Sequence, residues 1–257
     1  MILDKIIETK KEVVDQLKKQ TTLSALERTI ALLEPSRDFR QALISEDCNI
    51  IAEVKCASPS RGRLVADFDP VRIAGVYEQN GAAAISVLTD EKYFAGHKNY
   101  LTQIRQKVKL PLLRKDFIID TIQIYETRAI GADAILLIVH VLGKKLTEFI
   151  LLSKELGLSP LVEVHTEEEL DLALASEAEI IGINNRNLDS FVTDIETSRK
   201  LQARIPEGFI VVAESGIMSR ADIDILMQAD IHAFLIGEAL ITAPDIGKKL
   251  RTFKGEK

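Results

Sequence analysis

Short apolar runs recur along the chain from residue 48 onward, and each is followed by a turn and a segment with helical periodicity. The runs are rich in Ile, Val, Leu and Ala. They lie near 49–55, 83–88, 110–114, 133–138, 160–164, 180–184, 209–214 and 232–236. Runs that are apolar on both faces are typical of parallel strands covered by helices. The pattern therefore predicts eight strands that alternate with eight helices.

The segments between these runs carry the signals that begin and end helices. Asp69-Pro70 supplies an N-cap followed by proline at the first helical position. Gly131 and Gly157 lie where C-caps belong, residues 166–169 (TEEE) match a capping box, and Ser219 is a candidate N-cap. Eight such units close most economically as a (β/α)8 TIM barrel. The alternative is an open doubly wound sheet, but no Gly-x-Gly-x-x-Gly turn follows the first strand.

Three shorter segments precede the first strand. Residues 2–19 place apolar side chains on one helical face, with Lys and Glu opposite. Residues 24–27 (SALE) match a capping box that opens a second helix, and Ser36 is a candidate cap for a third. Nothing linker-like separates these segments from the rest. We therefore expect one domain, with residues 1–47 as an N-terminal helical extension and residues 48–257 as the barrel.

Composition narrows the class of protein. A length of 257 residues suits one barrel, and 46% apolar residues suffice for its core. The net charge of −6 argues against nucleic acid or an anionic membrane as a partner. No apolar run approaches the roughly 20 residues of a membrane span, and the N-terminal segment lacks the apolar region of a signal peptide. We expect a cytoplasmic enzyme or binding protein.

The two cysteines, Cys48 and Cys56, bear on the compartment. Along one extended segment they lie on the order of 26 Å apart. A disulfide needs Cα atoms within about 7 Å, so the two thiols are expected to be reduced. Reduced thiols fit a reducing compartment.

The segment 51–62 combines a buried strand with two opposite charges. Glu53 and Lys55 are two residues apart and therefore point to the same side of a strand. Both are costly to desolvate unless they are paired or used. One structural ion pair would explain this motif taken alone.

Similar polar strand ends recur downstream, where the active site of a barrel forms. The candidates are Glu53, Lys55, Lys115, Glu163, Asn184, Arg186, Glu214, Ser215 and Gly237. The charged residues fall mostly on odd-numbered strands, whose side chains share one layer of a barrel. Carboxylates and ammonium groups that meet there shift one another's pKa values, which is typical of a functional site. So many buried charges would be a poor choice for stability alone.

Two glycine turns predict an anion site. Residues 214–216 (ESG) end the seventh strand, and residues 236–238 (IGE) end the eighth. The loops after these strands form the usual phosphate site of the fold, although tight turns alone could explain the glycines. Because Glu238 is acidic, we expect its N–H to serve the anion and its side chain to turn away.

Other polar residues are expected to be unremarkable. The four histidines, His97, His140, His165 and His232, are scattered and lack the spacing of metal ligands. Asp116-Phe117 is expected to shape a loop.

At these positions the chain closely resembles the indole-3-glycerol phosphate synthase family of tryptophan biosynthesis. The matching segments are 51–62 (IAEVKCASPSRG), 88–96 (LTDEKYFAG), 111–117 (PLLRKDF), 131–139 (GADAILLIV), 160–164 (PLVEV), 181–188 (IGINNRNL), 212–217 (VAESGI) and 234–240 (FLIGEAL). The likeness extends over essentially the whole chain. The combination of these segments is far more specific than any one of them alone.

The resemblance implies a reaction. The family converts 1-(2-carboxyphenylamino)-1-deoxyribulose 5-phosphate, a phosphosugar-anthranilate substrate, into indole-3-glycerol phosphate, carbon dioxide and water, with no cofactor or metal. By resemblance Lys115 is the general acid, and nearby cations are expected to lower its pKa toward neutrality. Glu163 matches the general base, and Lys55 matches a residue that holds the substrate's anionic groups.

The resemblance also implies supporting roles. Glu53 and Glu214 orient the lysines, Phe94 packs against the aromatic ring, and Arg186 serves the substrate carboxylate or a neighbouring side chain. Positioning of hydroxyl or carbonyl groups falls to Asn184, Ser58 and Ser215, and phosphate binding to the backbone of Gly216, Gly237 and Glu238.

Cys56 and His97 depart from commoner family patterns, which affects the expected behaviour of loops more than the chemistry.

Two alternatives remain open from the sequence. Another phosphosugar barrel, such as phosphoribosylanthranilate isomerase, would share the phosphate loops. However, its Cys/Asp-type pair is not seen on the first and fourth strands. The second alternative is a noncatalytic barrel subunit, which would tolerate loss of Lys115 or Glu163. The sequence is silent on any partner from the same pathway.

Overall fold

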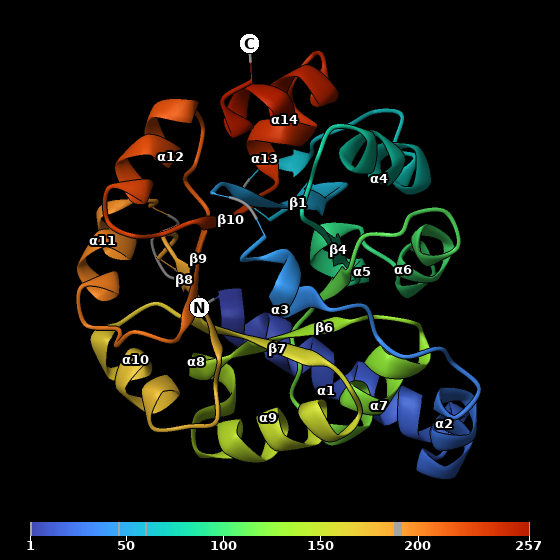
Figure 1. Ribbon diagram of the computed structural model, residues 1–257. Helices are drawn as coiled ribbons and strands as arrows, with labels where there is room; N and C mark the ends of the chain where they lie inside the picture. The colour runs from blue at the N-terminus through green and yellow to red at the C-terminus, as the bar shows by residue number, and fades with distance from the viewer. Residues whose placement is uncertain (1, 46, 60, 188–191, 257) are drawn as a thin grey trace.

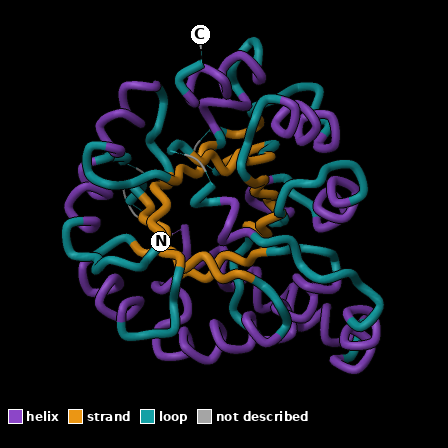
Figure 2. The backbone as a smooth tube through the Cα atoms, viewed as in Figure 1, coloured by secondary structure: helices purple, strands orange, loops and turns teal. Residues whose placement is uncertain are grey.

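The computed structural model is a closed barrel of eight parallel strands surrounded by helices (Figure 1), and it describes residues 2–45, 47–59, 61–187 and 192–256. The strands follow one another around the barrel in the order β1-β10-β9-β8-β7-β6-β5-β4. They are β1 Asn49–Val54, β4 Ala84–Leu88, β5 Leu112–Lys115, β6 Ala134–Ile138, β7 Ser159–Val164, β8 Ile180–Asn184, β9 Ile210–Glu214 and β10 Ala233–Ile236. Figure 2 shows the ring of strands inside the ring of helices. The predicted (β/α)8 barrel is confirmed, and each strand lies within two residues of its predicted bounds.

The helices lie before, between and after these strands. Those before β1 are α1 Ile2–Gln20, α2 Leu23–Ile30 and α3 Phe39–Ala42. The rest are α4 Pro70–Gln79, α5 Glu91–Phe94, α6 Lys98–Arg105, α7 Thr121–Ala129, α8 Val139–Leu142, η1 Gly143–Lys145, α9 Leu146–Glu155, α10 Glu167–Leu174, α11 Glu196–Gln202, α12 Arg220–Met227, α13 Glu238–Ile241 and α14 Ile246–Lys254. None of the helices within the described ranges has the length and apolar character needed to cross a membrane.

The core has an inner and an outer part, because each strand is buried on both faces. Alternate side chains such as Ile51, Leu113 and Leu161 fill the barrel interior, while their neighbours pack against the helices. Phe39 and Leu43, at most 1% exposed, pack against the residues that begin the strands. Burial of each contributes about 1.5–3 kcal/mol. The short α3 segment therefore closes the bottom of the barrel and leaves the opposite end for a site.

Two predicted caps before the barrel are wrong. Helix α2 begins after Thr22, whose hydroxyl accepts the N–H of Ala25, so Ser24 lies inside the helix. Helix α3 begins after Asp38, whose carboxylate accepts the N–H of Gln41. In both cases a residue with extended backbone directly precedes the first helical residue, and its side-chain oxygen accepts a backbone N–H of the first turn.

The predicted signals within the barrel are mostly confirmed. Asp69 and Ser219 are N-caps, and Gly131 and Gly157 have positive φ angles directly after helices. Residues 166–169 form only half of a capping box: Thr166 accepts the N–H of Glu169, but that glutamate bonds to His165.

The loop after β1 contains an element that the sequence did not predict. The two-residue strands β2 Ala57–Ser58 and β3 Gly62–Arg63 pair antiparallel. This hairpin holds Ser58 beside the open end of the barrel.

Candidate active site

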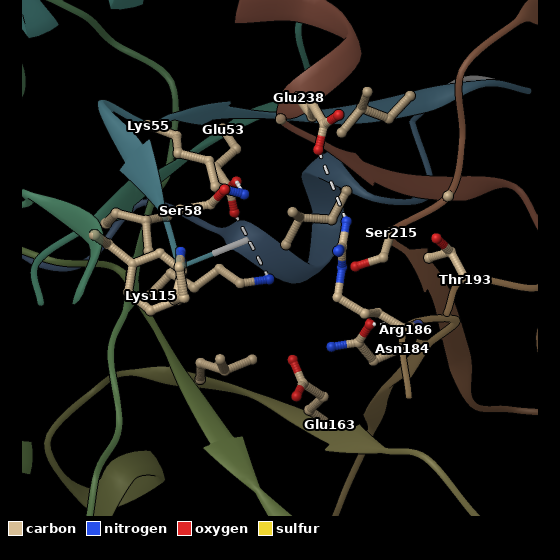
Figure 3. A pocket seen from close by; sticks show the side chains of 18 of the residues that line it. Glu53, Lys55, Ser58, Lys115, Glu163, Asn184, Arg186, Thr193, Ser215 and Glu238 are labelled. Carbon is tan, nitrogen blue, oxygen red and sulfur yellow. Dashed lines mark hydrogen bonds and ion pairs between the residues drawn. The ribbon is translucent and has the colours of Figure 1, made fainter. Parts of the chain in front are cut away.

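A pocket of about 510 Å³ lies at the C-terminal ends of the strands (Figure 3). Its lining includes nearly all the predicted site residues: Glu53, Lys55, Ser58, Phe94, Lys115, Glu163, Asn184, Arg186, Ser215, Gly216, Gly237 and Glu238. The remaining one, Glu214, lies directly beneath and contacts Lys115. Residues separated by up to 185 positions in the sequence therefore converge, as the alternation of strands predicts.

An ion cluster forms the floor of the pocket. The Nζ atom of Lys115 lies 2.7 Å from Glu214 Oε2 and 3.7 Å from Glu53 Oε2. Glu53 also lies 2.9 Å from Lys55 Nζ through its other oxygen, so it bridges the two lysines. The backbone carbonyl of Glu53 accepts a hydrogen bond from the buried hydroxyl of Tyr77. Both lysines are thus held with their ammonium groups at the pocket.

The predicted pKa of Lys115 is wrong in direction. Burial lowers its pKa, but the charges of Glu214, Glu53 and Glu163 outweigh burial and raise it above the ordinary lysine value. The surrounding charges are carboxylates rather than the cations that were expected. Lys115 therefore enters a reaction protonated, as a proton donor must.

Glu214 carries the complementary shift. Complete burial and the neighbouring charge of Glu163 raise its pKa to about 7, against the opposing effect of Lys115. Its Oε1 atom has no hydrogen-bond partner among the described residues. Glu53, in contrast, is buried but is flanked by Lys55 and Lys115, which hold its pKa below the usual value. Two buried glutamates on the same floor thus differ in their affinity for a proton.

Two glycines make room for these carboxylates. A Cβ atom on Gly182 would collide with Glu214 Oε1, and one on Gly237 would collide with Glu53 Oε1. Gly237 was predicted only as a phosphate-binding residue, and its lack of a side chain also fits the floor of the site. Gly182, inside β8, was not predicted.

One wall of the pocket is rich in turns and arginine. Ser215 and Gly216 both have positive φ, and Gly237 occupies the N-cap position of α13. The carboxylate of Glu238 lies 2.8 Å from Arg61. It also lies 3.7 Å from Arg186 (Figure 3). The expectation that Glu238 turns away from the pocket is therefore wrong, because the arginines attract its side chain into the lining. In this structure Arg186 serves a neighbouring side chain.

Another part of the pocket lining is apolar. Phe94 is only partly buried and lies 6.1 Å, between ring centroids, from Phe117. Its ring lines the pocket. Helix α1 adds Ile2, Leu3 and Ile6, which the sequence analysis did not assign to the site. Their only signal was the apolar face of the first helix.

No role was expected for His165, which lies beside Glu163. Its Nε2 atom lies 3.3 Å from Glu163 Oε1, and its Nδ1 atom lies 3.1 Å from Glu169 Oε2. Because His165 follows Glu163 by two residues, the period of a strand could have placed both on one side. Arg61 and Thr193 also line the pocket and were not predicted. Within the described ranges, no group of three or more His, Cys, Asp or Glu side chains is arranged to hold a metal ion.

Together these features define a (β/α)8-barrel enzyme with an acid–base cluster beside an arginine-lined wall and an apolar wall. A family model described as "Indole-3-glycerol phosphate synthase" matches residues 3–253. The chain belongs to the indole-3-glycerol phosphate synthase family, as the motifs in its sequence suggested.

Curated relatives bear the same name over nearly their full length. The protein from Desulforamulus reducens is 47% identical over 98% of this chain and 96% of its own. That from Alkaliphilus metalliredigens is 48% identical over 99% and 98%, and that from Chlorobium chlorochromatii is 51% identical over 93% and 94%.

Solved structures of distant proteins share the fold. Thiamine phosphate pyrophosphorylase from Pyrococcus furiosus superposes with a TM-score of 0.63 at 16% identity, covering 85% of this chain and 96% of its own. KGPDC from Streptococcus mutans gives a TM-score of 0.62 at 15% identity, covering 82% and 97%. These similarities concern the barrel alone.

Proposed function

We propose that this chain is the carboxy-lyase of tryptophan biosynthesis that closes the indole ring. The substrate is 1-(2-carboxyphenylamino)-1-deoxyribulose 5-phosphate, and the products are indole-3-glycerol phosphate, carbon dioxide and water. The observation that carries the assignment of roles is that Lys115 and Glu163 line the same pocket, with Lys115 held by two carboxylates.

Ring closure requires a proton donor. The aromatic carbon that bears the carboxylate attacks the ketone, and negative charge develops on the carbonyl oxygen. Lys115 protonates that oxygen, and its raised pKa ensures that the donor is charged beforehand. Carbon dioxide then leaves with its bonding electrons going to the ring, which regains aromaticity.

Dehydration requires a base and an acid on the same intermediate. Glu163 removes a proton from the substrate while the hydroxyl group leaves as water with a proton from a lysine. Lys55 is held 2.9 Å from Glu53, where it pairs with anionic groups of the substrate and assists this transfer. Asn184 and Ser58 line the pocket and position the sugar oxygens.

The two walls of the pocket match the two ends of the substrate. Phe94 packs against the anthranilate ring, while the phosphate rests on the backbone of Gly216, Gly237 and Glu238. Arg186 and Arg61 lie on the same side and are paired with Glu238 in this structure. A bound phosphate offers these guanidinium groups a stronger, doubly charged partner.

The protein is proposed to act in the cytoplasm. Cys48 and Cys56 are both buried, and neither forms a disulfide. Reduced thiols fit a reducing compartment.

The test is to supply the carboxyphenylamino deoxyribulose phosphate and follow indole absorbance or fluorescence. Lys115→Ala and Glu163→Gln should each lower turnover by about 10²-fold or more, the scale of lost acid–base catalysis. Lys11→Met, at an exposed lysine paired with Glu8, is the control and should leave turnover unchanged. No indole product from the wild-type protein would refute the activity, and near-normal turnover in either site variant would refute the roles.

A further inference from the structure

His165 lies behind Glu163 in an arrangement that the proposed reaction does not yet use. Glu169 Oε2 accepts the backbone N–H of His165 at 2.7 Å and lies 3.1 Å from its Nδ1 atom. The other oxygen of Glu169 lies 3.0 Å from Nδ1 of the half-exposed His140. The side chain of His165 is only 8% exposed. Its ring is therefore fixed between two carboxylates.

The hydrogen bond to Glu169 sets the state of the imidazole. The pKa of Glu169 lies below its usual value because hydrogen bonds and charge from His165 outweigh the effect of burial. An ionised carboxylate only accepts hydrogen bonds, so Nδ1 of His165 carries a proton. In the neutral ring, Nε2 is then a bare acceptor.

The position of Nε2 points to its use. This buried atom has no hydrogen-bond partner among the described residues, although Glu163 Oε1 lies 3.3 Å away. A bare nitrogen and an ionised carboxylate are both acceptors and cannot bond to each other. They form a hydrogen bond only when a proton is added between them, which is the state that Glu163 reaches after acting as a base.

We propose that His165 takes over the proton that Glu163 removes from the substrate. The O–H bond of the glutamic acid breaks, an N–H bond forms at Nε2, and the carboxylate of Glu163 is restored inside the occupied pocket. The imidazolium that results is paired with Glu169. The proton returns along the same path to Glu163, and from there to water, when the product leaves. His165 does not touch the substrate and acts through Glu163.

The charges around the ring favour this transfer. Burial lowers the pKa of His165, but the hydrogen bond to Glu169 and the charges of Glu163, Glu169 and Glu214 outweigh burial and raise it. These carboxylates come from β7, α10 and β9, and His140 of α8 lies beyond Glu169. The neutral acceptor form of His165 therefore predominates only when the pH exceeds its raised pKa, which lies above the ordinary histidine value of about 6.5.

The proposed role of His165 rests on the proposed function. The test compares the kcat of variants with that of the wild type in the same ring-closing reaction. We expect the kcat of His165→Gln to be about 10-fold lower than wild type on the alkaline plateau of the wild-type pH profile, less than the loss expected for Glu163→Gln. Near pH 5.5, where the wild-type imidazole is already protonated, the two kcat values should converge. The KM should change little, because His165 does not line the pocket.

A second variant guards against misfolding. Glu169→Gln keeps an acceptor for Nδ1 but removes the negative charge, so the titration seen in kcat should move to lower pH. His232→Asn, at a half-exposed histidine before β10, is the matched control and should retain the wild-type profile.

The outcomes separate the proposals. An equal loss at both pH values in His165→Gln, no loss at all, or an unshifted titration in Glu169→Gln overturns the role of His165 while the activity stands. Absence of indole formation by the wild type overturns the function itself.

Discussion

Replacement of Lys10 tests how the N-terminal helix is tied to the site. Lys10, on α1, is 3% exposed, and its Nζ atom lies 2.6 Å from Asp116 Oδ1 and 2.9 Å from Asp90 Oδ2. Asp116 follows Lys115, and Asp90 caps the helix that ends in Phe94. Asp116 is bonded in addition to Arg114 and Thr89. One buried ammonium group therefore joins the extension to two loops of the active site.

The expected cost of Lys10→Met follows from this burial. Removing one partner of a buried ion pair costs about 3–5 kcal/mol, because the charge left behind is unpaired. Arg114 remains 3.0 Å from Asp116, so we expect the lower end, about 3 kcal/mol. Asp90 loses its ammonium partner, and the pocket wall formed by Ile2, Leu3 and Ile6 loses its anchor. Turnover should fall together with stability.

The stability difference should depend on pH. Burial opposes the charge on Lys10, but Asp116 and Asp90 outweigh it and raise the pKa, so this contribution is present until the pH rises through that value. Arg114 and Lys10 outweigh burial at Asp116 and lower its pKa, so its contribution is lost as the pH falls through the folded value. The difference between wild type and variant should therefore be large near neutrality and shrink in acid.

Urea denaturation near neutral pH measures the free energy of unfolding, and Lys11→Met provides the control on the same helix. Lys11 and its partner Glu8 are 60% and 70% exposed, and such a pair contributes at most about 1 kcal/mol. A cycle with Asp90→Asn should give a coupling energy of about 1 kcal/mol or more. The reasoning is refuted if Lys10→Met costs no more than Lys11→Met.

Two further predictions concern the floor of the pocket. Gly237→Ala places a Cβ atom against Glu53 and should lower kcat about 10-fold or more, because the acid–base groups are displaced. The control is Gly75→Ala, which has no atom within 4 Å of the added Cβ and should stabilise α4 by up to about 1 kcal/mol. Equal kcat values in the two variants would contradict the expectation for Gly237. The pKa of Glu214 is about 7 in the folded state, compared with an ordinary value of 4.5. The contribution of Glu214 to stability therefore declines as the pH rises from about 4.5 to 7. Glu214→Gln should lack that decline in urea denaturation at several pH values, and identical pH slopes in both proteins would rule it out.

Local patterns predicted the parts of the site that the strands themselves position. Glu53, Lys115, Glu163 and Glu214 lie at or near the ends of β1, β5, β7 and β9, and the geometry of a barrel brings such ends together. Their convergence required only the eight apolar runs. The pKa of Lys115 could not be predicted in the same way, because its direction depends on which charges lie within a few ångströms of its Nζ atom.

The features that the sequence did not predict depend on contacts between distant segments. The partners of Lys10 lie 80 and 106 residues away, and no periodicity links α1 to the loops that carry them. The desolvation of such a group is costly without partners, so its burial holds only in the arrangement that supplies both aspartates. The same dependence makes the extension part of the active site: the helix that carries Lys10 also supplies the wall that Ile2, Leu3 and Ile6 form. A change at Lys10 should therefore affect substrate binding as well as stability, although its charged group pairs with Asp90 and Asp116.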